Sequence, residues 1–171
     1  MKIINVRHSW PEKEGFFLSR NRNNKDYIFL HFFNSVEISY GGNTYNTLPN
    51  SVVIFRPSTH HSYLSRVPLK HNWFLFSLKS EEEIANFGIE SDKIYSIQDG
   101  DFITKILRTV ENEFLAPKSY SDELICVKLN ELFIKLALQE RESKLIKLKT
   151  ICDDNGFDYN DFYERYDGKA I

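Results

Sequence analysis

The sequence predicts an α+β fold in which a β jelly roll or barrel extends to about residue 98 and two α-helices follow it. Its 171 residues, of which 42% are hydrophobic and 15% aromatic, are enough to bury one core. About six or seven short apolar runs at roughly 8–12-residue spacing are typical of a sandwich or barrel. After residue 99 the apolar residues recur at intervals of three and four, as on one face of a helix.

Strands are expected where aromatic and β-branched residues cluster between turn signals. These runs cover residues 27–33, 36–40, 43–48, 51–55, 62–67, 73–78 and 94–97, with a short helix at 81–87 before the last run. The first run is almost entirely apolar, which indicates a strand covered on both faces. Gly41 and Gly42 separate two runs and supply the positive φ angles of a tight hairpin. Residues 1–26 lack a clear period, and we expect a polar N-terminal arm anchored by Trp10 and Phe16.

Two helices are expected after residue 99. The first buries one face, formed by Phe102, Ile103, Ile106, Leu107, Val110 and Phe114. Asp99 or Asp101 can cap its start, and Pro117 prevents its continuation. The second helix covers about residues 121–149 and has two apolar stripes: Ile125, Leu129, Leu132 and Leu136, and Leu124, Val127, Ile134 and Leu138. One stripe must cover the sheet or the first helix. The other is either internal as well or an exposed patch of the kind that marks a partner surface.

Charge and composition exclude several classes of protein. The formal net charge of −2 and the pI of about 6.2 differ from those of a free-standing nucleic-acid binder, so no direct DNA binding is expected from this chain alone. The first ten residues lack the apolar core of a signal peptide, and the longest apolar runs are shorter than a membrane span. Cys126 and Cys152 form no CxxC motif and are interpreted as reduced thiols. These observations predict a cytoplasmic protein without a membrane segment.

The stretch NSVVIFRPSTHHSYLSRVPLKHNWFLF, residues 50–76, concentrates the side chains suited to a binding site. A strand leads into a proline-fixed turn, which is followed by His60, His61 and Tyr63 and then by a second strand. His60 and His61 are adjacent, so only one of them can enter a barrel. Alternation along the second strand places His71 and Trp73 on one face, consistent with a pocket wall.

This stretch resembles the second conserved segment of the cupin domain in AraC-type transcriptional regulators. In that segment a Pro-Gly-x-x-His-x-Tyr turn precedes a strand with His-x-Trp and a closing Phe, and Ser58 stands here in place of the usual glycine. The resemblance extends from about residue 10 to about residue 148. It implies a cupin-type jelly roll, a small-molecule effector expected to be a sugar, and the effector-binding and dimerisation part of a regulator rather than an enzyme.

The resemblance also implies which residues meet the ligand. These are Arg20, Tyr63, His71 and Trp73. An indole face such as that of Trp73 can stack on the apolar side of a sugar ring, and the guanidinium of Arg20 can donate several hydrogen bonds to hydroxyls. In the simpler interpretation Trp73 is an ordinary core aromatic, His71 ends a loop and Arg20 is a surface charge.

The family dimerises through a helix at the position of the second helix, so a homodimer is expected here. The predicted subunit contact is the stripe of Ile125, Leu129, Leu132 and Leu136. The tail, residues 150–171, resembles a fragment of an AraC-type helix-turn-helix. It has six acidic and two basic residues, a net charge of −4 (two minus six), so it is expected to be a remnant that does not bind DNA. The chain is therefore divided at residues 98 and 149.

Two alternatives remain open. In cupin enzymes a metal is held by His-x-His and Glu from one motif and by His from the next. Here His31 has no His-x-His partner and Glu37 has the wrong spacing, so neither a metal nor another cofactor is expected. The first alternative is a cupin enzyme with a non-standard metal site, such as an isomerase or dioxygenase. The second is a truncated regulator that only dimerises.

Overall fold

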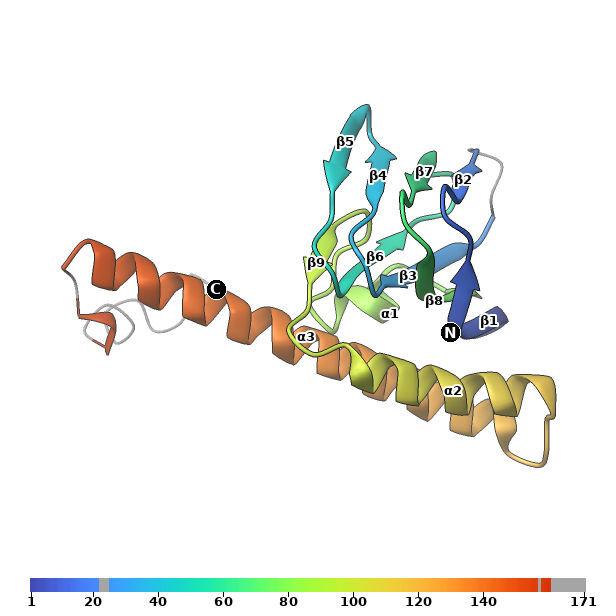
Figure 1. Cartoon of the computed structure of the whole chain (residues 1–171). Coiled ribbons are helices and arrows are strands. Elements are labelled where there is room, and N and C mark those ends of the chain that lie inside the picture. The colour runs from blue at the N-terminus through green and yellow to red at the C-terminus, as the bar shows by residue number, and fades with distance from the viewer. Residues whose placement is uncertain (22–24, 157, 161–171) are drawn as a thin grey trace.

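The computed structural model describes residues 1–21, 25–156 and 158–160. The strands are β1 (Lys2–Glu12), β2 (Phe17–Arg20), β3 (Tyr27–Phe32), β4 (Glu37–Tyr40), β5 (Asn43–Asn46), β6 (Ser51–Phe55), β7 (His61–Leu64), β8 (Leu69–Ser77) and β9 (Ile94–Ser96). The helices are α1 (Glu82–Ala85), α2 (Asp101–Leu115) and α3 (Ser121–Asp154) (Figure 1). Strands thus occupy the first part of the chain and long helices the rest, as the sequence predicts.

The strands form two antiparallel sheets. One has the order β1-β8-β3-β6-β9 and the other the order β2-β7-β4-β5. The antiparallel pairs β1/β8, β2/β7, β3/β6 and β4/β5 belong alternately to the larger and the smaller sheet. This arrangement is the winding of two Greek keys in a jelly roll. β9 extends one edge of the larger sheet. The predicted fold class is confirmed: a cupin-like β-sandwich followed by C-terminal helices.

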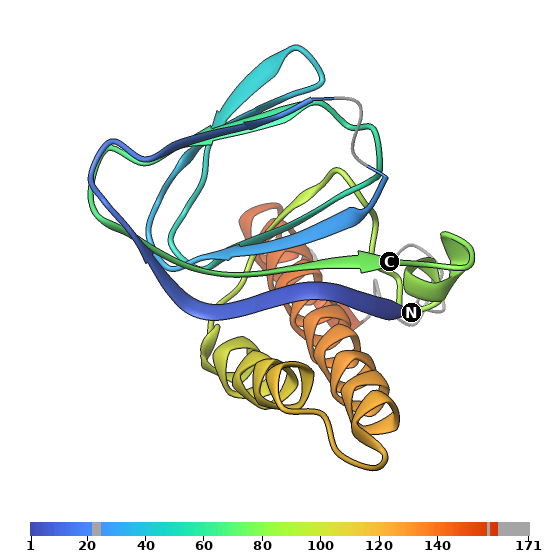
Figure 2. The same ribbon diagram turned by 90° about the vertical axis from the view of Figure 1, so that its right-hand side faces the viewer.

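Two cores hold the fold together because the larger sheet is covered on both faces. Figure 2 shows α2 and α3 on its outer face, while the smaller sheet lies opposite its inner face. Phe29 and Phe74 pack outward against the helices, whereas Leu30 and Phe55 pack inward between the sheets. Every residue of β3 is buried as a result, which explains its uninterrupted apolar sequence.

The prediction of an N-terminal arm is wrong, because residues 2–12 and 17–20 form two strands. β1 pairs with β8 from Lys2↔Ser77 to Glu12↔Leu69, and β2 pairs with β7. The register of β1 shifts between Ile3 and Asn5 and again between Arg7 and Trp10. Each irregularity interrupts the two-residue alternation that identifies a strand in sequence. A strand of 11 residues therefore appears unpatterned.

The two long helices begin where the sequence predicts, and α3 ends later. The Asp99 carboxylate accepts a hydrogen bond from the backbone N–H of Asp101 at 2.9 Å at the start of α2, and α2 ends before Pro117. α3 continues past the predicted residue 149 to Asp154, and Figure 1 shows its second half extending beyond the barrel. Within the described ranges, no helix is both long and apolar enough to cross a membrane. Residues 161–171, which carry much of the helix-turn-helix resemblance, lie outside the described residues.

The assignment of subunit-contact residues on α3 needs correction. The predicted stripe lies inside the chain, packed with α2 and the larger sheet; its members Ile125, Leu129, Leu132 and Leu136 are at most 8% exposed. The second stripe is the exposed one, with Leu124, Val127, Ile134 and Leu138 between 38% and 60% exposed. One stripe thus packs inside the chain and the other is exposed, so the residues predicted to form the subunit contact are the buried ones.

Candidate functional site

The four residues predicted to meet a ligand line a single cavity of about 240 Å³. Arg20 lies on β2, Tyr63 on β7, and His71 and Trp73 on β8. We call this cavity the indole pocket and define it by its lining residues: Asn5, Arg7, Trp10, Glu12, Phe16, Leu18, Arg20, Ile28, Tyr63, His71 and Trp73. Several of these residues lie on β1 and β2, which are edge strands of the two sheets. A cavity of this size suits a small ligand.

His71 supplies unused hydrogen-bonding groups deep in the pocket. It is 2% exposed, and neither ring nitrogen has a hydrogen-bond partner among the described residues. Burial lowers the pKa of His71 to about 4, so the ring is neutral at pH 7. Its Nε2 lies 3.8 Å from Glu12 Oε1, too far for a hydrogen bond, and the neutral ring forms no ion pair there. Buried polar atoms normally have partners, so His71 has one donor and one acceptor available to a ligand.

Tyr63 sits in an aromatic wall beside His71. Its ring centre lies 5.1 Å from that of Phe32, 5.9 Å from that of Phe16 and 6.1 Å from that of His71. Burial is the main cause that raises the pKa of Tyr63, so its phenol remains protonated and can donate. The nearby Arg20 opposes this rise in pKa and Glu12 adds to it, which indicates that both charged groups act on the same part of the pocket.

The charged and indole groups complete the chemistry of the indole pocket. The Arg20 side chain has no hydrogen bond or ion pair with the rest of the described chain, so its donors are free for a ligand. Trp10 and Trp73 are both partly exposed, and the Arg7 guanidinium lies 5.6 Å from the Trp10 ring centre. Flat apolar faces beside strong donors suit a ligand with both a hydrophobic face and several hydroxyls.

β1 contributes pocket residues that the sequence did not reveal. Trp10 was expected as an anchor of the N-terminal arm, whereas Asn5, Arg7 and Glu12 were not identified. Asn5 and Arg7 are two residues apart, as are Trp10 and Glu12, so each pair shows the alternation of a strand. Across the register shift, Arg7 and Trp10 are an odd number of residues apart, which conceals this alternation.

The histidine turn has a left-handed residue at the position where the resembled motif has glycine. Ser58, at the position usually occupied by glycine, has φ of 65°, the left-handed region that glycine enters most easily. Only one of the paired histidines enters the barrel, as predicted. His61 is buried and stacks on Phe55 at 3.9 Å, whereas His60 is exposed. The turn therefore forms with serine in place of glycine.

The residues considered for a metal do not come together. His31 lies on the other face of β3, where its Nδ1 is 2.8 Å from Asn72 Nδ2, and Glu37 lies 3.6 Å from Arg66 at the surface. In the part of the chain that the structure describes, no group of three His, Cys, Asp or Glu side chains could hold a metal ion.

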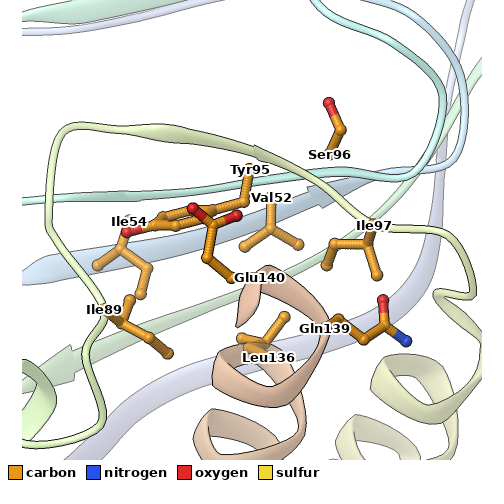
Figure 3. Close-up of a pocket in the computed structure, with 9 residues that line it drawn as sticks. All are labelled: Val52, Ile54, Ile89, Tyr95, Ser96, Ile97, Leu136, Gln139 and Glu140. Carbon is orange, nitrogen blue, oxygen red and sulfur yellow. The ribbon is translucent and has the colours of Figure 1, made fainter. Parts of the chain in front are cut away.

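Two other hollows lack the features of the indole pocket. A surface groove of about 480 Å³ lies between loops and includes Phe33, Pro49 and Arg66. Its charged groups, Glu37 and Arg66, face each other across 3.6 Å. A second hollow, between the larger sheet and α3, is shown in Figure 3. It measures about 10 Å³, which is space for roughly one water, so it is a packed seam.

No family model matches this chain, and no curated protein matches it. Solved structures match parts of it. The Cupin_2 domain of an XRE-family transcriptional regulator from Enterobacter cloacae is similar over 40% of this chain and 77% of that chain, with 12% identity and a TM-score of 0.35. A Cupin 2 conserved barrel domain protein from Salinispora arenicola is similar over 44% of this chain, with 11% identity and a TM-score of 0.35. An RmlC-like cupin protein from Desulfovibrio desulfuricans is similar over 43% of this chain and 77% of that chain, with 13% identity and a TM-score of 0.34.

These matches leave more than half of this chain uncovered, and the Salinispora arenicola match spans 66% of that protein, less than two thirds. The fold itself is defined by strand order, because strands β1 to β8 follow the jelly-roll winding with every pairing antiparallel. The protein therefore has a cupin-like β-sandwich fold followed by C-terminal helices.

Proposed function

We propose that this chain is the effector-binding and dimerisation part of a transcriptional regulator similar to the AraC type, and that a small sugar binds in the indole pocket. The observation that supports this proposal is the convergence of Arg20, Tyr63, His71 and Trp73, from three strands, on one cavity. The role of the pocket is binding rather than catalysis, and the regulator acts in the cytoplasm. No direct DNA binding is proposed for this chain.

The unpartnered groups of the pocket favour a neutral, hydroxyl-rich ligand. His71 and Tyr63 are uncharged at pH 7. Arg20 donates, Glu12 accepts, and the ring nitrogens of His71 can do both. Hydroxyls match such a mixed set because each one donates and accepts. Trp73 offers a flat face to the C–H side of a sugar ring.

Thermal stability in the presence of monosaccharides tests the ligand. A sugar that binds only the folded protein is expected to add about 2.7 kcal/mol at a concentration 100 times its Kd, which raises the melting temperature by about 5–10 °C in a chain of this size. Trp73→Ala is expected to abolish the rise because it removes the stacking face. The measurement is a thermal-shift screen against a panel of monosaccharides.

A matched control separates the pocket from the rest of the surface. Tyr45→Ala removes an aromatic ring that is 40% exposed and lies outside the indole pocket, so the sugar response should persist. If no sugar raises the melting temperature while both variants remain folded, the sugar proposal is wrong. About one equivalent of iron, manganese or zinc in the purified protein, lost in His61→Ala, would instead favour a cupin enzyme.

The proposed homodimer uses the exposed stripe of α3 against a second copy of the chain. The stripe extends along the helix from Leu124 through Val127 and Ile134 to Leu138. Glu131 lies within this span and is paired with Lys128 at 2.8 Å and Lys135 at 2.7 Å, which neutralises its charge locally. An exposed apolar stripe along one face of a helix suits packing against another helix.

Charged substitutions in this stripe are expected to give a folded monomer. Val127→Glu with Ile134→Glu places two carboxylates on the proposed contact, where pairing of two copies would bury them without partners. Sedimentation or light scattering measures the mass, and circular dichroism confirms folding. Lys118→Glu, which adds charge outside the stripe, serves as the control and should remain dimeric. A double variant that stays dimeric would place the contact elsewhere.

A further inference from the structure

β1 is a wall that the indole pocket shares with α2. Asn5, Arg7, Trp10 and Glu12 line the pocket. The same strand packs against α2, and Figure 2 shows both long helices beneath the sheet that contains it. α2 in turn packs along α3. A displacement of β1 would therefore act on both the pocket and the helices.

The bulge in β1 is tied to α2 through a buried polar side chain of β8. Ser9 has φ of 48°, and its backbone N–H donates to Asn72 Oδ1 at 2.7 Å. The Asn72 amide donates to Thr104 Oγ1 on α2 at 2.9 Å and lies 2.8 Å from His31 Nδ1. Asn72 is fully buried, so these contacts are shielded from water and costly to leave unmade. The bulge thus has a defined position relative to α2.

A second link comes from Glu111, a carboxylate of α2 that is only 9% exposed. Its Oε2 accepts a hydrogen bond from the His8 backbone N–H at 3.1 Å and contacts His8 Nδ1. Its Oε1 lies 3.5 Å from Arg7 Nη1. Arg7 also lies over the Trp10 ring and lines the indole pocket. One carboxylate of the helix therefore contacts two consecutive residues of β1, of which Arg7 lines the pocket.

We propose that Glu111 is a positioning residue that couples the indole pocket to the α2–α3 hairpin. A ligand atom that accepts a hydrogen bond from Arg7 draws the guanidinium away from Glu111. The contact between β1 and α2 then weakens. Because the coupling free energy is reciprocal, a change at α2 alters the affinity of the pocket for its ligand by the same amount. The coupling rests on the proposed function only for the identity of the ligand, because the link itself consists of contacts within the chain.

Fluorescence of Trp10 tests the link from helix to pocket without any ligand. The chain has two tryptophans, so Trp73→Phe leaves Trp10 as the sole indole. In that background Glu111→Gln is expected to change the acrylamide quenching of Trp10, because Arg7 loses its ion pair with Glu111 and keeps only its hydrogen bonds to Val6 O and Asn5 Oδ1. Glu111→Asp, which keeps the charge, should restore part of the change.

Glu113→Gln is the matched control for this experiment. It makes the same substitution on the same helix, where the carboxylate accepts a hydrogen bond from Ser121 Oγ and does not contact β1. Quenching in this control should equal that of the parent. Equal quenching in Glu111→Gln, Glu113→Gln and the parent would overturn the coupling.

Hydrogen exchange tests the opposite direction. Arg7→Met is expected to speed exchange of the α2 backbone amides about fivefold, the lower end of measured couplings between sites. Arg66→Met, which removes an exposed arginine that lies near Glu37 instead, should leave α2 unchanged. This exchange experiment remains decisive if Glu111→Gln fails to fold. Unchanged exchange of the α2 amides in folded Arg7→Met would refute the proposal. Failure of every sugar to bind would leave both results intact, so the two proposals are tested separately.

Discussion

Lowering the pH from 7 to 5 is expected to remove about 6 kcal/mol of folding stability, about 2 kcal/mol for each of three buried histidines. Burial lowers the pKa of His31, His61 and His71 to about 4 each, and all three are at most 2% exposed. In the unfolded chain each has a pKa of about 6.5. Since a small domain is stable by about 5–15 kcal/mol, this loss is a large fraction of the total.

The direction of the effect follows from proton binding. Between pH 6.5 and pH 4 the unfolded chain takes up protons on these histidines while the folded chain does not. Acid therefore favours unfolding across this window. Above the unfolded pKa the three groups are neutral in both states and stability is independent of their titration. Below pH 4 the folded rings protonate as well, and the loss reaches its limit.

Urea unfolding at pH 7, 6 and 5 measures this dependence. His61→Phe keeps an aromatic ring stacked on Phe55 and removes one titrating group, so the pH-dependent loss should fall by about a third. Leu48→Ala changes an exposed side chain that has no titratable group and should leave the dependence unchanged. Equal pH dependence in the parent and His61→Phe would show that His61 does not titrate as its burial requires.

Leu132→Glu is expected to unfold the protein or to lower its melting temperature by at least about 10 °C. Leu132 is fully buried between the helices and the sheet, so a carboxylate there loses its hydration and the packing of the leucine. Truncating such a leucine alone costs about 2–5 kcal/mol, and burying an unpaired charge adds to this. In a chain of this size each kcal/mol lowers the melting temperature by about 2–4 °C.

Ile134→Glu makes a comparable change two residues away on the exposed stripe. Ile134 is 48% exposed, so its carboxylate remains hydrated and the folded monomer should melt within a few degrees of the parent. Thermal denaturation followed by circular dichroism compares the two variants. A cooperatively folded, monomeric Leu132→Glu with parental stability would return the subunit contact to the first stripe.

The two stripes of α3 show what the sequence can and cannot predict. The first stripe consists of Leu and Ile, and the second of Leu, Ile and Val. Their hydrophobicity therefore does not show which stripe is buried. The choice depends on the side from which the helix meets the sheet, which is a property of tertiary packing. Clusters of aromatic and β-branched residues between turn signals, by contrast, predicted β6 with its observed bounds and placed most other strands to within a few residues.

The site was predictable to the extent that it lies on regular strands. His71 and Trp73 follow simple alternation along β8, and the motif around Ser58 led to Tyr63. β1 was missed because its two register shifts break the pattern. Glu111 was missed for a different reason. Its role depends on a contact with residues about 100 positions earlier in the chain, which no local pattern encodes.

Because α3 is one continuous helix, a small tilt at the barrel would be amplified at its far end. Its 34 residues span about 51 Å at 1.5 Å per residue. The Gln139 amide of α3 donates to the Asp99 carbonyl, in the loop before α2, at 3.1 Å. The part of α3 from Gln139 to Asp154 is about 22 Å long. A tilt of about 10° at the barrel would move the far end by about 4 Å, so a change too small to alter the fold would be amplified into a displacement larger than a hydrogen bond is long.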